Sequence, residues 1–441
     1  MSGDNESVRI DGGLVWNGQD LQACSPLIEQ GKITAFISPE KAGYTPADRV
    51  VDVTGQWILP GGIDIHVHIS DGTETFWRGS CCAAAGGITT VLDMAPFHAC
   101  VTPQQYKQKI AAADQEMLVD FGLIAGIVVS TEDLPHLEEL KTLGTPFFKV
   151  FMPADPPVSS TTLWEAVKEA SHSGLRLALH AEESACIEKV SNWRDPLAFA
   201  HSRPVVAESN AVGQVLEMAR AAGAPIHICH VSASRTCELI AWGKAQGIDV
   251  TGETAVHYLL LNEEDYKKYG AKAKITPPLR SRHNNHDLWK ALADGTIDAV
   301  ACDHYTEAQT GKPTDMEHAA SGIPGLEVSL PLLFSEGVIK KRISLARYIS
   351  LTASSPAALA GMGAKKGRLA VGRDADFYCI DPLAEWQMSG QGEFSRIPTT
   401  PFSGWDIRGK ITQTWLRGRQ IWDGKNILQP ASWGRWISSG S

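Results

Sequence analysis

Short apolar runs alternate, from residue 58 onward, with longer segments whose apolar positions recur every three to four residues. The short runs have the length of buried strands, and the longer segments have the period of helices with one packed face. The pattern predicts helices over residues 103–115, 163–173, 207–222, 236–246 and 284–293. It predicts eight strands, over residues 58–69, 89–94, 121–129, 145–152, 175–180, 225–231, 249–254 and 298–303.

The central part of the chain, residues 58–365, has the size and rhythm of a (β/α)8 barrel. Its predicted strands are almost uniformly apolar, as a parallel sheet covered on both faces requires. We therefore predict an α/β protein built around a TIM-like barrel.

Both ends of the chain show a different pattern, with short strand-like runs separated by glycine-containing turns. We predict that residues 1–57 and 366–441 together build one small β domain, a β-sandwich, and that the barrel is inserted between them. The expected strands are residues 8–10, 13–16, 32–37 and 49–53 in the first part, and 367–370, 375–380, 411–416 and 419–422 in the second.

Composition and charge argue against several classes of protein. The 441 residues carry a formal net charge of −10, which argues against a nucleic-acid-binding protein. Nine cysteines without CxxC spacing fit a reducing compartment better than a disulfide framework. The first residues lack the basic and apolar regions of a leader, and no run of about 18 apolar residues predicts a membrane span. We therefore expect a cytoplasmic protein.

Ionisable side chains stand at the ends of five predicted strands, where barrel enzymes carry their chemistry. The first strand ends in two histidines one residue apart, so both imidazoles project to one face and could hold one cation. A single strand-end histidine is usually only a satisfied polar residue, and Asp303 could instead be a structural partner of His304. The ordered set is much harder to explain that way: His66, His68, Lys149, His180, His230 and Asp303.

Lys149 is the least expected member, because its neighbours are Phe147, Phe148, Val150 and Phe151. Burying an ammonium among apolar side chains is costly. The simpler interpretation is an ion pair across the barrel. The functional interpretation is a desolvated, neutral amine that reacts with CO2 to give a carbamate, which could bridge two cations.

Several motifs resemble the amidohydrolase superfamily, and more closely its cyclic amidohydrolase branch of allantoinases, hydantoinases or dihydropyrimidinases, and dihydroorotases. The motifs are L-P-G-G-I-D-I-H-V-H, F-K-V-F-M, H-A-E, H-V-S and C-D-H, and the resemblance covers nearly the whole chain. It implies two divalent metal ions, with zinc the first choice and Mn, Co, Ni or Fe as alternatives. It also implies a bridging hydroxide as nucleophile, with Asp303 as general base and then general acid. In the implied metal set, His66, His68 and Asp303 hold one ion, His180 and His230 hold the other, and carbamylated Lys149 bridges them.

The loops after the strands narrow the substrate class. Ser70 stands where dihydroorotases carry an arginine for the substrate carboxylate. Ala154 stands where hydantoinases carry an oxyanion-binding tyrosine, and Asp155 follows, near an acidic position of allantoinases. An allantoinase-like enzyme for a small cyclic ureide is thus the first choice; a hydantoinase, dihydropyrimidinase or other cyclic imide hydrolase is the alternative. The resemblance also assigns substrate contacts to Thr276, Gly322 and Ile323, which otherwise are barrel-loop turns, and suggests a homodimer or homotetramer.

Two hypotheses from other classes are disfavoured by the same residues. A non-catalytic scaffold relative would have lost metal ligands, whereas this chain keeps all six. An exocyclic deaminase would lack the lysine on the fourth strand, which Lys149 supplies. We also predict that His227 packs under the helices, and that Cys229 faces away from the site, because neighbours on a strand alternate.

Overall fold

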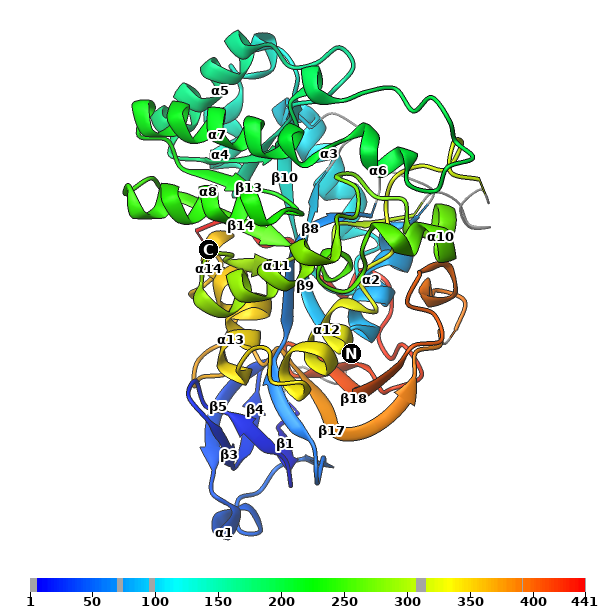
Figure 1. Cartoon of the computed structure of the whole chain (residues 1–441). Coiled ribbons are helices and arrows are strands. Elements are labelled where there is room, and N and C mark those ends of the chain that lie inside the picture. Colours follow the sequence, from blue (N-terminus) through cyan, green and yellow to red (C-terminus); the bar gives the residue numbers. More distant parts are fainter. Residues whose placement is uncertain (1–5, 70–73, 95–99, 307–314, 391, 441) are drawn as a thin grey trace.

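A closed barrel forms the centre of the computed structural model, which describes residues 6–69, 74–94, 100–306, 315–390 and 392–440 (Figure 1). Nine parallel strands follow one another around the sheet, and the strands at its two ends, β15 and β16, belong to one segment of chain. Since β15 pairs with β14 and β16 pairs with β8, the sheet closes on itself as an eight-stranded barrel. The predicted TIM-like fold is confirmed. The strands are β8 (Gly62–His68), β9 (Ile88–Met94), β10 (Asp120–Val128), β11 (Phe147–Phe151), β12 (Arg176–His180), β13 (Ile226–Ile228), β14 (Val250–Thr254), β15 (Ala299–Val300) and β16 (His304–Tyr305).

Helices cover the outside of the barrel, and their ends carry clear local signals. Thr102 and Gln105 form a capping box at the start of α3. Gly174 and Gly223 end α5 and α7 in the left-handed conformation that favours glycine. The longer helices are α2 (Phe76–Ala85), α3 (Pro103–Asp114), α5 (Ser160–Ser173), α7 (Val205–Ala222), α8 (Ser234–Ala245) and α11 (Arg282–Asp294). Shorter ones are α4 (Leu137–Thr142), α6 (Ala198–Ser202), α9 (Val256–Leu260), α10 (Tyr266–Tyr269), α12 (Ser329–Leu333), α13 (Leu345–Ile349) and α14 (Ser355–Leu359).

Both chain ends build a second unit, below the barrel in Figure 1. One sheet has the order β5-β4-β1-β6 and the other β19-β18-β17-β7-β2-β3. The second sheet therefore joins three strands from the C-terminal part to three from the N-terminal part, at the β17–β7 pair. Phe377 and Trp415 stack within its core, with ring centroids 5.4 Å apart. The strands are β1 (Val8–Asp11), β2 (Leu14–Trp16), β3 (Leu21–Ala23), β4 (Ser25–Glu29), β5 (Lys32–Ile37), β6 (Arg49–Asp52), β7 (Trp57–Pro60), β17 (Phe377–Gln387), β18 (Asp406–Leu416) and β19 (Arg419–Trp422), with the short helix α1 (Pro39–Ala42) after β5.

The segment predicted as one strand over residues 58–69 is two strands. β7 pairs with β17 and β2 in the second unit, whereas β8 lies in the barrel. Gly61 separates them at a close approach, where an added Cβ would lie 2.2 Å from Thr89 Oγ1. The strand predicted over residues 367–370 does not form, and β17 begins at Phe377. The domain limits at residues 57 and 365 remain our proposal, with β7 as the strand by which the chain enters the barrel.

The last described residues return to the barrel and pack at the end where its strands begin. Phe121 at the start of β10 donates its amide to Arg435 O at 3.0 Å and accepts from the Ile437 amide at 2.8 Å. Ile437 packs against the buried cluster inside the barrel, which includes Ile63, Leu92 and Phe147. The opposite end, where the strands finish, therefore remains the end at which a site can open.

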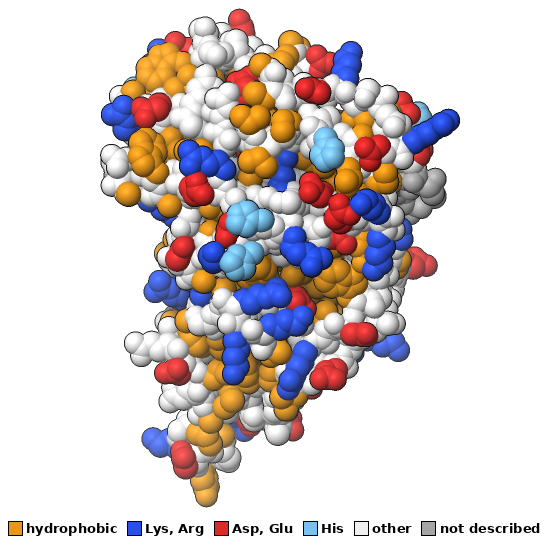
Figure 2. All heavy atoms as spheres, viewed as in Figure 1, with side chains coloured by type: hydrophobic (Ala, Val, Ile, Leu, Met, Phe, Trp, Pro, Cys, Tyr) orange, Lys and Arg blue, Asp and Glu red, His pale blue; other side chains and the backbone are white. Residues whose placement is uncertain are grey.

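The surface mixes charged and apolar side chains. On the face drawn in Figure 2, basic side chains are densest across the middle, and acidic ones are scattered over the whole height. None of the described helices is long and apolar enough to span a membrane.

Candidate functional site

A cavity of about 670 Å³ opens at the carboxyl ends of the barrel strands. All six residues predicted as metal ligands line it, although they come from five strand ends spread over 238 positions of the chain, from 66 to 303. His66 and His68 project from β8, and Lys149 and His180 from β11 and β12. His230 follows β13, and Asp303 lies between β15 and β16.

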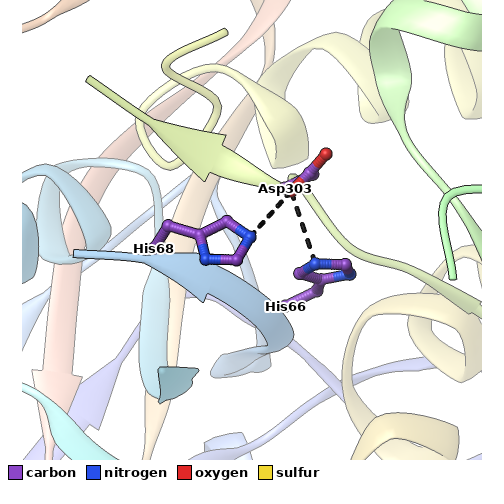
Figure 3. Close-up of side chains that lie close together, drawn as sticks. All are labelled: His66, His68 and Asp303. Atoms are coloured by element: carbon purple, nitrogen blue, oxygen red, sulfur yellow. Dashed lines mark ion pairs between the residues drawn. The ribbon is translucent and has the colours of Figure 1, made fainter. Parts of the chain in front are cut away.

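His66, His68 and Asp303 form the tightest group in the cavity (Figure 3). One carboxylate oxygen of Asp303, Oδ1, lies 3.4 Å from His66 Nε2 and 3.2 Å from His68 Nε2. One donor atom from each of the three residues lies within 4.8 Å of the others. Two imidazoles and a carboxylate at this separation are a ligand set that divalent transition metals accept.

Backbone conformation turns two of these residues into the cavity. Asp303 has a φ of 48° and His230 a φ of 37°, both in the left-handed region that residues other than glycine rarely adopt. Such strain persists only where the surrounding structure enforces it, and it concentrates at functional sites. His230 lies shortly after β13, and Asp303 lies between β15 and β16, where the regular alternation of side chains has ended.

Electrostatics keep the carboxylate charged and the imidazoles neutral. Burial would raise the pKa of Asp303, but the neighbouring His66 and His68 lower it to about 2. Desolvation lowers the pKa of His66 and His180, and lowers that of His230 well below its ordinary value. Neutral imidazoles offer a lone pair, which is the form a metal ion requires.

Further side chains hold the first two histidines in place. Glu253, on β14, bonds His66 Nδ1, and the carbonyl of Met94 bonds His68 Nδ1. These contacts fix the ring orientation and leave the Nε2 atoms directed at Asp303. Glu253 was not singled out in the sequence, where it is one of several acidic residues. Its place at the end of a predicted strand was the signal that could have identified it.

A second supporting group stands behind His180. Its Nε2 lies 2.7 Å from Glu182 Oε2, and Arg203 donates to the same oxygen from Nη2 at 2.6 Å. Glu182 is fully buried; burial would raise its pKa, but the His180 hydrogen bond and the Arg203 charge lower it to about 2. The H-A-E spacing pointed to Glu182, whereas nothing in the sequence connected Arg203 to the site.

His227 and Cys229 lie inside the barrel, so the prediction that they face away from the site is wrong. His227 contacts Thr251 Oγ1 at 2.8 Å and Glu253 Oε2 at 3.2 Å. The Cys229 thiol lies 3.0 Å from Lys149 Nζ. The prediction failed because β13 ends at Ile228 and the left-handed backbone of His230 brings a third side chain to the same face.

Lys149 is buried without a counter-charge in contact. Its amino group donates to the Cys229 sulfur, and no carboxylate of a described residue lies within ion-pair distance. Burial raises the pKa of the Cys229 thiol to about 12, so this neighbour stays neutral. The ion pair across the barrel, which the sequence left open, is therefore not formed among the described residues.

Only some of the residues predicted to contact the substrate line the cavity. Ala154, Asp155, Thr276 and Gly322 line the cavity. Ile323 does not; it is buried behind the wall and forms an isolated bridge with His304. Ser70 lies outside the described residues.

His304 does not pair with Asp303, which was the structural alternative for that aspartate. Its Nε2 lies 2.6 Å from Glu74 Oε2, and its Nδ1 accepts from the Gly325 amide at 3.1 Å. Glu74 in turn accepts from Arg396 Nε at 2.7 Å, so this network ties the last barrel strand to the segment before β18. Asp303 is left to face the histidines.

The residues present fit a metal centre by their chemistry. The donors are neutral imidazoles and an ionised carboxylate, in a cavity where no protein cation pairs with that carboxylate among the described residues. His230 Nδ1 is buried and has no hydrogen-bond partner in the described part of the chain. A buried polar atom without a partner is costly, and metal sites are one place where it occurs.

Comparisons with known proteins show what the chain is similar to. The family model described as amidohydrolase family matches residues 57–421. An allantoinase from Rubrobacter xylanophilus is 34% identical over 443 residues, covering 95% of each chain. An allantoinase from Solibacter usitatus is 32% identical over 440 residues, covering 95% of this chain and 94% of the relative. The solved structure of an L-hydantoinase (dihydropyrimidinase) from Arthrobacter aurescens has a TM-score of 0.90 and 28% identity, covering 98% of this chain and 100% of that one.

Proposed function

The chain belongs to the amidohydrolase family, whose members are metal-dependent, and we propose that it hydrolyses a C–N bond in a cyclic ureide, with allantoin as the first choice of substrate. The observation that carries this proposal is the convergence of six ionisable side chains from five strand ends on one cavity. No structural role in a barrel core requires that combination, because buried charges are costly unless they are paired or bind a metal.

The proposed centre holds two divalent ions. His66, His68 and Asp303 would hold one, His180 and His230 the other, and a carbamate on Lys149 would bridge them. The proximity of the imidazoles supports this assignment: the ring centroids of His180 and His230 are 4.5 Å apart, and those of His66 and His230 are 5.4 Å apart. Ions held there would supply Lewis acidity, which lowers the pKa of water and polarises the substrate carbonyl. Zinc is our first choice, with Mn, Co, Ni or Fe as alternatives.

Asp303 is the proposed proton carrier. Because its pKa is held at about 2, it is a carboxylate at neutral pH and can accept a proton from the attacking water. Water adds to the ring carbonyl carbon, the bond from that carbon to the ring nitrogen breaks, and the proton passes from Asp303 to the departing nitrogen. The product carries a carboxylate on one side and a terminal urea nitrogen on the other.

The choice of allantoin rests on sequence relatives and on the cavity wall. Both curated relatives described above are allantoinases. The wall carries Ala154 and Asp155, and therefore lacks at that place the tyrosine hydroxyl expected of a hydantoinase. Hydantoinase or dihydropyrimidinase activity is the second candidate, favoured by the structural similarity to the Arthrobacter aurescens enzyme. Ser70, Ala154, Asp155, Thr276, Gly322 and Ile323 remain proposed substrate contacts, with Thr276, Gly322 and Ile323 contributing backbone groups.

The location and assembly of the protein are also proposals. All nine cysteines are free thiols, which supports a reducing, cytoplasmic setting. A homodimer or homotetramer follows from the family resemblance alone.

A substrate comparison tests the proposed function. The metal-loaded protein would be assayed with allantoin, hydantoin, dihydrouracil, dihydroorotate and succinimide, and kcat/KM compared. We expect allantoin to have the highest value. A higher value for hydantoin or dihydrouracil would favour the second candidate, and turnover of none of the five would refute the cyclic amide assignment.

A further inference from the structure

Two charged side chains on the cavity wall are not among the proposed metal ligands. Asp155 lies in the loop after β11, and Arg203 follows α6. Apart from Lys149, Arg203 is the one Lys or Arg among the described residues that line the cavity. Apart from Asp303, Asp155 is the one carboxylate in the same set.

Arg203 is held rigidly and retains a free edge. Its Nε and Nη2 donate to Glu182 at 3.1 and 2.6 Å, and Glu182 is fully buried. Its Nη1 donates to no described residue. A guanidinium fixed along one edge can present its remaining N–H groups to a ligand at little entropic cost.

Arg280 shows what a purely structural arginine looks like in this protein. It is buried beside Arg203, and all three of its nitrogens are engaged. Nε donates to Ser232 Oγ at 2.9 Å, Nη2 donates to Glu208 Oε2 at 3.2 Å, and Nη1 donates to the Arg203 carbonyl. Arg280 does not line the cavity. The unused Nη1 of Arg203 is therefore not required by the local packing.

Asp155 also retains its hydrogen-bonding capacity. Its carboxylate forms no hydrogen bond or ion pair with another described residue, including Arg203. The wall thus offers one anionic acceptor and one cationic donor that do not neutralise each other.

A ureido group matches these two features. Its carbonyl oxygen accepts hydrogen bonds, and its N–H and NH2 groups donate them. Allantoin is a hydantoin ring with a ureido substituent, so hydantoin is the same ring without that group. We propose that Arg203 and Asp155 form a subsite for the exocyclic ureido group, with Arg203 donating to its carbonyl and Asp155 accepting from its nitrogens. This inference rests on the proposed function and names the residues that select the substrate.

The test is the ratio of kcat/KM for allantoin to kcat/KM for hydantoin, measured with metal-loaded wild type, Asp155→Asn and Arg203→Lys. Damage to the metal centre lowers kcat/KM for both substrates, whereas loss of the ureido contacts lowers kcat/KM for allantoin only. We expect each variant to lower the ratio by about tenfold or more, as expected for a hydrogen bond to a charged group. Asp155→Asn is the cleaner variant, because Asp155 holds no other described residue in place.

Arg280→Lys is the matched control, because it alters a buried guanidinium next to Arg203 that does not line the cavity. It should leave the ratio unchanged. Metal content per chain, measured on the same samples, shows whether Arg203→Lys has disturbed His180 through Glu182.

The experiment distinguishes failure of the proposed function from failure of the ureido subsite. If wild type prefers hydantoin to allantoin, the proposed function fails before any variant is considered. If wild type prefers allantoin but Asp155→Asn keeps the ratio, or lowers both values by the same factor, the ureido subsite is overturned and the proposed function stands.

Discussion

Among the single residues of this cavity, Lys149 lacks, within the described part of the chain, the carboxylate partner that a buried lysine usually has. Lys149 is buried and contacts a neutral thiol rather than a carboxylate. A lysine in that setting carries an uncompensated charge unless its amine is neutral or modified. The proposed carbamate converts it into an anion that two cations would balance.

Replacing Lys149 by alanine tests this role. We expect turnover to fall by roughly a thousandfold or more, the scale on which catalytic groups that act as a unit respond to loss of one member. Bound metal should fall in parallel, and short carboxylic acids should restore part of the activity by occupying the place of the carbamate. The control is Lys168→Ala, which removes an exposed lysine paired with Glu165. Full activity of the Lys149 variant would contradict the proposed centre.

Glu182 gives a pH-dependent prediction. Its pKa is lowered from 4.5 to about 2 in the folded protein, so the folded state favours the carboxylate. Its contribution to stability is therefore fully present above its unfolded pKa and is lost as the pH falls towards 2. The shift corresponds to about 3 kcal/mol. Chemical unfolding of the metal-free protein should show that excess pH dependence in wild type and not in Glu182→Gln. Equal pH dependence in both proteins would show that the carboxylate contributes nothing.

At the scale of elements, the sequence predicted the barrel strands well and their ends poorly. Periodicity located the eight strand segments and five of the six longer helices to within a few residues, because both patterns reflect burial; it missed α2. It did not show that the first predicted strand divides at Gly61, where close contact with Thr89 excludes a side chain. Nor did it predict the inward direction of His227 and Cys229.

The candidate ligands were predictable because barrel chemistry sits at strand ends, and each of the six followed an apolar run. Their supporting residues were not. Glu253 contacts His66 directly, and Arg203 acts on His180 through Glu182. Both are distant in sequence from those histidines, and only the closed barrel brings them together. Contacts of this kind depend on tertiary packing and leave no local pattern.

The returning C-terminal segment is an element whose role can be tested. Gly434 passes so close to the residue before β10 that an added Cβ would lie 2.0 Å from the Val119 carbonyl oxygen. We expect Gly434→Ala to lower the free energy of unfolding by about 1–3 kcal/mol, because a backbone atom cannot easily move away. The control is Gly213→Ala within α7, where nothing lies within 4 Å and the change should not destabilise. Equal denaturation midpoints for the two variants would show that the segment does not pack there.

At the scale of the whole molecule, a buried charge cluster joins the barrel to the second unit. Lys366 Nζ lies 2.5 Å from Asp120 at the start of β10 and 2.5 Å from Asp376 just before β17. Arg417, after β18, also contacts Asp120. The cluster therefore spans three segments that belong to both units.

Removing the central cation should loosen that junction. Lys366→Met leaves two buried carboxylates without their shared partner, and we expect a loss of about 3–5 kcal/mol in the free energy of unfolding. Because the cluster is far along the barrel from the cavity, kcat/KM of the folded variant should stay close to wild type. Unchanged stability would show that Arg417 alone balances the carboxylates.

We propose that this barrel is a metal-dependent hydrolase that opens allantoin. The most direct test is the rate of allantoin ring opening by metal-stripped protein, as zinc is added back stepwise in bicarbonate buffer. We expect no turnover without metal and a rate that rises to a plateau at about two ions per chain. Turnover that persists without metal would contradict the proposal, as would a reloaded protein that leaves allantoin intact.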